Sequence, residues 1–255
     1  MNRLTSAEKI LQSLGITEPD EIDLEAIAWT QNVKIKCRHL EGCEAQIIGD
    51  EDVAIISVDI DVSDNRKRFS IAHELGHWNH DRGKSFYCKS DAIGFNIANN
   101  KIAEQNANKF AANLILPPYI FFPILKNYSN ISFDAIKDAA NKFKTSLTAT
   151  AIQVIESNLF PAILVLCQKN KRKWFKRARQ IPGRWFPDEY LDRGTEAYKI
   201  FKGNFRESSS TLPAITWFDN QENDEYEVTE YSFRITENEI LSLIVFDDDR
   251  MLEDK

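Results

Sequence analysis

The chain has 255 residues, of which 43% are hydrophobic, 28% charged and 11% aromatic. This balance is typical of a folded globular protein and excludes disordered and fibrous classes. The formal charge of −7 excludes a protein that coats nucleic acid with its whole surface. No apolar run reaches the roughly 18 residues of a membrane helix, and the first residues lack the apolar core of a secretion signal. We therefore expect a cytoplasmic protein with no membrane partner and with reduced thiols at its four cysteines.

The first 60 residues predict two amphipathic helices followed by a small sheet. Thr5 or Ser6 can cap a helix that runs to Leu14, and Asp23 can cap a second helix over residues 24–31. The short runs VKIKCRHL, EAQIIGD and VAIISVDI (residues 33–40, 44–50 and 53–60) favour β-strands, because turn-prone pairs separate them.

Residues 65–157 favour helices. The segment NRKRFSIAHELGHWNHD predicts a helix over residues 65–81, with Asp64 as its cap and Gly83 just beyond its end. A second helix is expected from about Ile102 to Leu116, where two prolines stop it. A helical pair follows over residues 132–143 and 145–157.

Beyond residue 160 the pattern becomes β-rich, in the runs ILVLC, KWFKRA, AITWF, EVTEYSFRI and ILSLIVFD. We therefore place a domain boundary near residue 160. Between Lys169 and Arg184 the chain also gathers eight basic residues. This run would suit phosphates or an acidic partner, or it forms a solvated hairpin whose charges keep an edge strand from pairing.

The sharpest chemical signal is an HExxH motif, His73-Glu74-Leu75-Gly76-His77, within the predicted helix. Histidines four residues apart project from one helix face, so His73 and His77 can bind one zinc ion. Glu74 emerges about 100° around the helix, where it can reach water at the metal without being a ligand. The alternative is a helix with incidental polar residues.

A catalytic zinc usually takes a third protein ligand. His80 lies two turns from His73, roughly 10 Å by helical rise, so both cannot bind one ion. His80 then has a structural role, or it is a hydrogen-bond donor that lies outside the group of metal ligands. No histidine follows it, which leaves a carboxylate, and Glu104 opens the next predicted helix. A glutamate in a first turn can equally be a partner of the helix dipole.

The segments RFSIAHELGHWNH and EQNANKFAANLILP together resemble the ImmA/IrrE family of bacterial zinc peptidases. The resemblance implies an α+β fold with three parts. These are a minimal zincin-like metallopeptidase domain over residues 1–125, a helix-turn-helix-like segment over 126–160, and a β-rich regulatory or sensor-like domain over 161–255. It also implies His73, His77 and Glu104 as metal ligands and Glu74 as the catalytic glutamate. Zinc is the implied cofactor, and Mn²⁺ also suits these nitrogen and oxygen donors.

Members of that family cleave or relieve a helix-turn-helix transcriptional repressor, which implies a site-specific regulatory endopeptidase with such a repressor as its protein substrate. Two alternatives are a module that sequesters the repressor without cutting it, and a DNA-binding regulator that uses residues 132–157. The helical pair has few basic residues for a reading face, so direct nucleic-acid binding is not expected. We also expect residues 161–255 to regulate the enzyme or to recruit its partner and not to perform the chemistry, because all four predicted site residues precede residue 105.

The sequence suggests candidates for two further features of the active site, the donor that stabilises the oxyanion and the strand that binds the substrate. Candidates for the donor that stabilises the oxyanion are Tyr87, Tyr119 and His39. In zincins that resemble this chain, the substrate pairs with an edge strand beside the active-site helix, and residues 53–60 are the nearest candidate in sequence.

Overall fold

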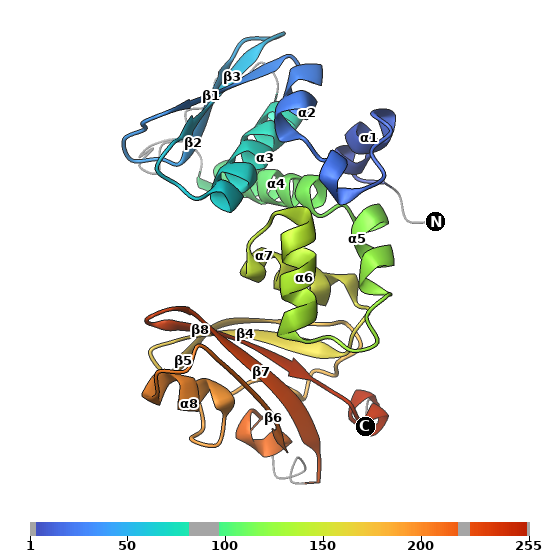
Figure 1. The fold of residues 1–255 in the computed structure, drawn as a ribbon, viewed down its shortest axis with the longest axis vertical. Helices are drawn as coiled ribbons and strands as arrows, with labels where there is room; N and C mark the ends of the chain where they lie inside the picture. The colour runs from blue at the N-terminus through green and yellow to red at the C-terminus, as the bar shows by residue number, and fades with distance from the viewer. Residues whose placement is uncertain (1–3, 82–96, 219–224, 254–255) are drawn as a thin grey trace. The chain divides into compact units, whose positions relative to one another are not determined.

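A computed structural model describes residues 4–81, 97–218 and 225–253 (Figure 1). The chain divides into two units. The N-terminal unit comprises residues 1–123 and 140–146, and the C-terminal unit comprises residues 124–139 and 147–255. The expected α+β class with a β-rich C-terminal region is confirmed. The division into parts at residues 125 and 160 stays a prediction. Within the described ranges, no helix has the length and apolarity needed to cross a membrane.

The described helices largely follow the expected segments. They are α1 (Ser6–Ser13), α2 (Leu24–Thr30), α3 (Asp64–Asp81), α4 (Ile97–Ile115), α5 (Pro118–Leu125), α6 (Phe133–Phe143), α7 (Leu147–Ser157) and α8 (Glu196–Lys202). Thr5 caps α1 in a capping box with Glu8, and Asp23 caps α2 by accepting from two backbone N–H groups. Both of these caps were expected from the sequence.

The boundaries of α3 and α4 differ from expectation. Asp64 is the first residue of α3 and not its cap, since the N–H of Lys67 already donates to the carbonyl of Ser63. Gly83 lies outside the described residues. Helix α4 begins at Ile97, earlier than the expected Ile102, and so includes asparagines of low helix propensity at residues 99 and 100. Glu104 therefore lies inside α4, away from the first turn, and the helix-dipole explanation for it is wrong.

The N-terminal unit contains a three-stranded sheet of β1 (Val33–Arg38), β2 (Ala45–Gly49) and β3 (Ala54–Asp59). Its order is β1-β3-β2, with β1 parallel and β2 antiparallel to β3. One face buries Val33, Ile47 and Ile56, and α3 contacts both β2 and β3. Because β3 is the central strand, it has no free edge, so the expectation that residues 53–60 receive the substrate is wrong.

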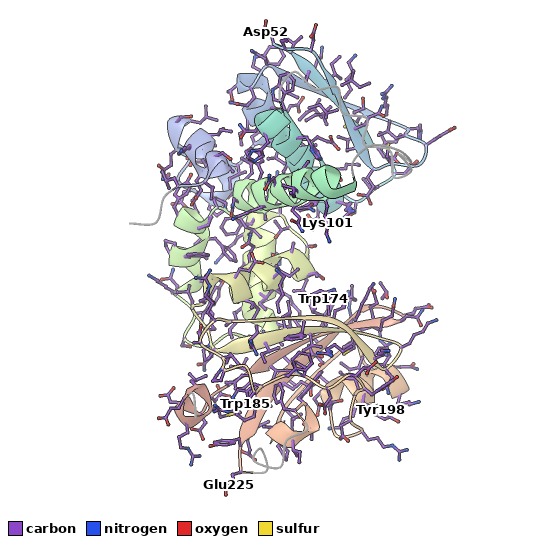
Figure 2. The ribbon with its side chains drawn as sticks, turned by 180° about the vertical axis from the view of Figure 1, so that it is seen from behind. Asp52, Lys101, Trp174, Trp185, Tyr198 and Glu225 are labelled. Atoms are coloured by element: carbon purple, nitrogen blue, oxygen red, sulfur yellow. The ribbon has the colours of Figure 1, made fainter. Side chains whose placement is uncertain are left out.

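The C-terminal unit contains an antiparallel sheet of five strands in the order β5-β4-β8-β7-β6. Its strands are β4 (Ala162–Gln168), β5 (Lys171–Arg177), β6 (Glu207–Pro213), β7 (Glu227–Thr236) and β8 (Glu239–Val245). Phe133 of α6 contacts Phe233 on one face, whereas α8 packs against β6, β7 and β8 on the other (Figure 1). Trp185, labelled in Figure 2, is fully buried and packs edge-on against the rings of Phe218 and Phe246.

Several elements were not expected from the sequence. The run AITWF does not form a strand: residues 214–216 make a 3-10 helix, and Ala214, Trp217 and Phe218 are buried. Strand β6 is rich in serine, and α8 lies in a segment with no clear apolar period. Helix α5 starts at Pro118, whose fixed φ suits the first position of a helix.

Candidate metal centre

Helices α3 and α4 cross in close contact at Gly76. A β-carbon at that position would lie 2.8 Å from the Cα of Ala107 and 3.0 Å from its carbonyl oxygen, so only glycine allows this separation. Ala107 lies three residues after Glu104 and one before Asn108, on the part of α4 that faces α3. The crossing therefore brings Glu104 and Asn108 of α4 to the face of α3 that carries the HExxH motif.

Three predicted site residues converge at this crossing. The Nε2 atoms of His73 and His77 lie 3.0 Å apart, and each faces a different oxygen of the Glu104 carboxylate, at 3.2 and 3.3 Å respectively. One donor atom from each residue lies within 4.8 Å of the other two. The side chain of His77 is 1% exposed and that of Glu104 is 47% exposed, so the centre is anchored inside the unit and opens on one side.

Two imidazole nitrogens and one carboxylate are a donor set that suits zinc, and a site with three protein ligands leaves a position for water or substrate. The close approach of the three donor atoms fits a metal ion, because all three can direct a lone pair at one cation between them. The fold thus provides a candidate metal site, and the assignment of the individual ligands stays a prediction.

Glu74, the predicted catalytic glutamate, is 3% exposed. Burial, and next the charge of Glu104, raise the pKa of Glu74 to about 8. Its Oε2 atom is buried and accepts no hydrogen bond from any described residue. A carboxylate whose oxygen is not held by a neighbour and whose pKa is near neutrality is suited to accept and return a proton.

The remaining candidate residues have other contacts. The ring of His80 packs edge-on against Phe110, which fits the structural role considered for it. The hydroxyl of Tyr119 donates to the carbonyl of Ile16 at 2.6 Å, so it is not free to stabilise an oxyanion. His39 is exposed and pairs with Asp61. Tyr87 lies outside the described residues.

A second group of potential ligands, His39, Asp59 and Asp61, lies where the parallel strands β1 and β3 end. The side chains of His39 and Asp61 are 75% and 73% exposed, and exposed groups of this kind commonly form simple surface ion pairs.

One residue near the centre belongs to the segment that carries the family resemblance, but no role was predicted for it. The Oδ1 atom of Asn108 lies 3.0 Å from the Nδ1 atom of His73, on the side of the ring opposite the nitrogen that faces Glu104. The spacing of four residues between Glu104 and Asn108 is the signal that was available, because it places both on one face of α4.

Comparisons with known proteins relate the chain to one family and one solved structure. Residues 45–154 match the family model described as Peptidase_M78, IrrE N-terminal-like domain, which confirms the resemblance over that region. No curated protein matches the chain. Among solved structures, a Mycobacterium tuberculosis transcriptional regulator is similar with a TM-score of 0.65 and 12% identity, over 94% of this chain and 75% of that one. At this identity the likeness shows the fold alone.

Proposed function

We propose, from the premise that residues 45–154 are an IrrE N-terminal-like domain of the ImmA/IrrE family, that the chain is a zinc-dependent, site-specific endopeptidase. The observation that carries the proposal is the convergence of His73, His77 and Glu104 beside the buried Glu74. We further propose that its substrate is a helix-turn-helix transcriptional repressor and that cleavage acts as a regulatory or stress-response switch.

In this proposal His73, His77 and Glu104 hold the ion. When bound, zinc would act as a Lewis acid that polarises a peptide carbonyl and lowers the pKa of the water bound to it towards about 7. Glu74 takes a proton from the attacking water and returns it to the leaving amine. The enclosed position of Glu74, 3% exposed, keeps bulk water away from the carboxylate during this transfer.

Strand β2 has an open edge to which an extended substrate can add. Its other edge pairs with β3, and α3, which carries the HExxH motif, contacts β2 directly. Among the described residues β2 pairs with no further strand. A substrate that added to this edge would extend the sheet through main-chain hydrogen bonds, which give affinity without demanding a particular sequence.

The DNA-binding alternative has less support. Five residues of α7, the second helix of the helix-turn-helix-like pair, are buried and so are not available to read base edges: Thr150, Ala151, Gln153, Val154 and Ile155. The sequestering alternative does not require Glu74, whereas a peptidase does.

The basic run at residues 169–184 fits the solvated hairpin better than a phosphate site. Strand β5 is the edge strand of its sheet, and Lys171, Lys173 and Lys176 pair with Glu189, Glu239 and Glu156. Charges that are paired within the chain contribute little to binding an external anion.

The experiment that tests the proposal incubates the purified full chain, loaded with zinc, with the helix-turn-helix repressor encoded beside its gene. We expect the intact repressor to be converted into two fragments, and expect a chelator or Glu74→Gln to prevent it. Stable binding without fragments by the wild-type protein would favour sequestration instead. Loading with Mn²⁺ in a parallel reaction identifies the metal that supports cleavage.

A further inference from the structure

The contact between Asn108 and His73 has a chemical consequence for the metal centre. A neutral imidazole carries its proton on one nitrogen, and the other nitrogen offers a lone pair. The Oδ1 atom of Asn108 only accepts hydrogen bonds, so a hydrogen bond across this 3.0 Å contact requires the proton on Nδ1 of His73. The Nε2 atom of His73, which faces Glu104 and His77, is then the nitrogen with the free lone pair.

We propose that Asn108 is a positioning residue that fixes the tautomer and ring orientation of His73 for metal binding. The inference rests on the proposed function and deepens it. Glu104 and Asn108 are one helical turn apart on α4, and between them they address both nitrogens of the same ring. Two anchors on one rigid helix restrict rotation of the ring about its Cβ–Cγ bond, which one anchor alone does not do.

The opposite orientation of the Asn108 amide would have the opposite effect. If its NH₂ group donated to Nδ1, the proton of His73 would move to Nε2 and would point at the other donor atoms. A metal ligand needs Nε2 without a proton, so only the orientation with Oδ1 as acceptor suits the site. Asn108 is exposed, so the bond contributes little to the stability of the fold.

The crossing of α3 and α4 brings Asn108 close to His73. Ala107, the neighbour of Asn108, lies against Gly76, the residue before His77. This backbone contact sets the height and separation of the two helices at the ring of His73. Asn106 lies two residues before Asn108, about 200° around α4, and is also exposed, which makes it a matched control of the same chemistry.

Three variants of the full chain test the proposal: Asn108→Leu, Asn108→Asp and Asn106→Leu. Zinc affinity is measured by competition with a chromophoric chelator, and the His73 tautomer by nitrogen-15 NMR of the imidazole. We expect Asn108→Leu to weaken zinc binding by about 10- to 100-fold, the range seen when a group that orients a histidine ligand is removed. Asn108→Asp keeps an acceptor at this place, so its affinity should stay near the wild-type value, as should that of Asn106→Leu.

A second readout separates positioning from general damage to the fold. Cobalt substituted for zinc should show an altered visible spectrum in Asn108→Leu at saturating metal, while the thermal unfolding midpoint stays close to that of Asn106→Leu. The proposal is overturned if Asn108→Leu binds zinc as tightly as the wild-type protein, or if Asn108→Asp loses as much affinity as Asn108→Leu. If the wild-type chain binds no metal, the proposed function fails, and the proton on Nδ1 of His73 still shows whether Asn108 sets the tautomer.

Discussion

Gly76 and Ala107 are in backbone contact, since a β-carbon on Gly76 would lie 2.8 Å from the Cα of Ala107. This contact determines how far Glu104 stands from His73 and His77. The spacing of the candidate metal centre is therefore set by a residue that is not one of its three candidate ligands.

Gly76→Ala should lower both the stability and the metal affinity of the chain. The added methyl group must push α4 away from α3 or strain the crossing, at a cost of about 1–3 kcal/mol. We expect a lower midpoint of thermal unfolding and weaker competition for zinc. Gly183→Ala is the control, because a β-carbon there meets nothing within 4 Å. An equal and small effect of both substitutions would contradict this role for Gly76.

Glu74→Gln should preserve the fold and zinc binding while peptide cleavage falls by about 10²- to 10⁴-fold, because an amide cannot carry the proton. The cleavage rate and zinc content are measured on the same preparation. Cleavage at the wild-type rate would show that Glu74 is not the proton carrier. Loss of zinc together with activity would instead make it a ligand.

Cys167 should make the protein less stable at alkaline pH. The thiol is fully buried, and burial, with a smaller effect of Glu230, raises its pKa from about 9 to about 12. Above pH 9 the thiol ionises in the unfolded chain but stays protonated in the folded one, so stability falls as pH rises towards 12. At pH 10 this amounts to about 1.4 kcal/mol. The free energies of unfolding of wild type and Cys167→Ala should therefore draw closer between pH 8 and pH 10, and an unchanged difference would refute the assignment.

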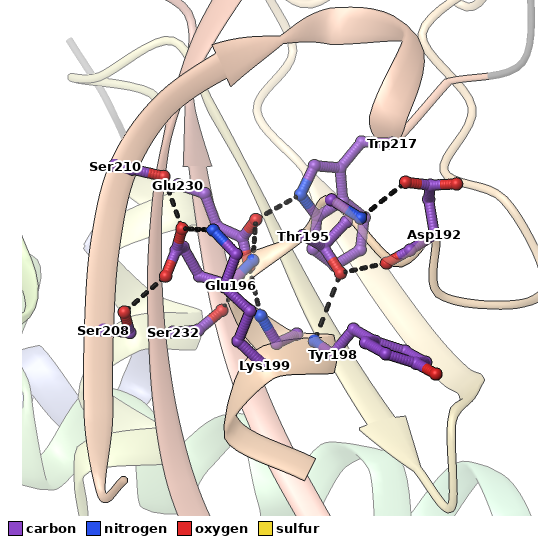
Figure 3. Close-up of polar contacts among 12 residues, drawn as sticks. Asp192, Thr195, Glu196, Tyr198, Lys199, Ser208, Ser210, Trp217, Glu230 and Ser232 are labelled. Atoms are coloured by element: carbon purple, nitrogen blue, oxygen red, sulfur yellow. Dashed lines mark hydrogen bonds and ion pairs between the residues drawn. The ribbon is translucent and has the colours of Figure 1, made fainter. Parts of the chain in front are cut away.

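Glu230→Gln should destabilise the C-terminal unit without affecting the metal centre. This fully buried carboxylate accepts from the backbone N–H groups of Glu196 and Ala197 and from the indole of Trp217 (Figure 3). It also accepts from the hydroxyl of Ser232. A glutamine places an NH₂ group against these donors, which costs about 1–3 kcal/mol in denaturant unfolding. Glu227→Gln, an exposed change on the same strand, is the control and should cost far less. A reduced zinc affinity in Glu230→Gln would contradict the separation of roles.

The sequence was sufficient for the parts of the fold that rest on local signals. The caps at Thr5 and Asp23 were predictable because a single side chain satisfies the first N–H groups of each helix. The convergence of His73 and His77 follows from helical spacing alone. Glu104 was predicted as the third ligand because a carboxylate was the remaining type, although its place inside α4 was not foreseen.

The rest depends on contacts between segments that are distant in the chain. Strand order cannot be deduced from apolar runs, so β3 was taken for the edge that β2 forms. The serine-rich β6 is stabilised by pairing with β7 and by the contacts of Ser208 and Ser210 with Glu196, which no pattern in its own sequence indicates. The role proposed for Asn108 became evident only from its contact with His73, which depends on how α4 packs against α3.

Metal analysis of His77→Ala tests the central claim most directly, because His77 is the most buried of the three candidate ligands. Zinc per chain is measured by elemental analysis on wild type, His77→Ala and the control His80→Ala, each purified in the same way. We predict one zinc ion per chain in wild type and in His80→Ala, and none in His77→Ala. An undiminished zinc content in His77→Ala would contradict the metal centre described for this chain.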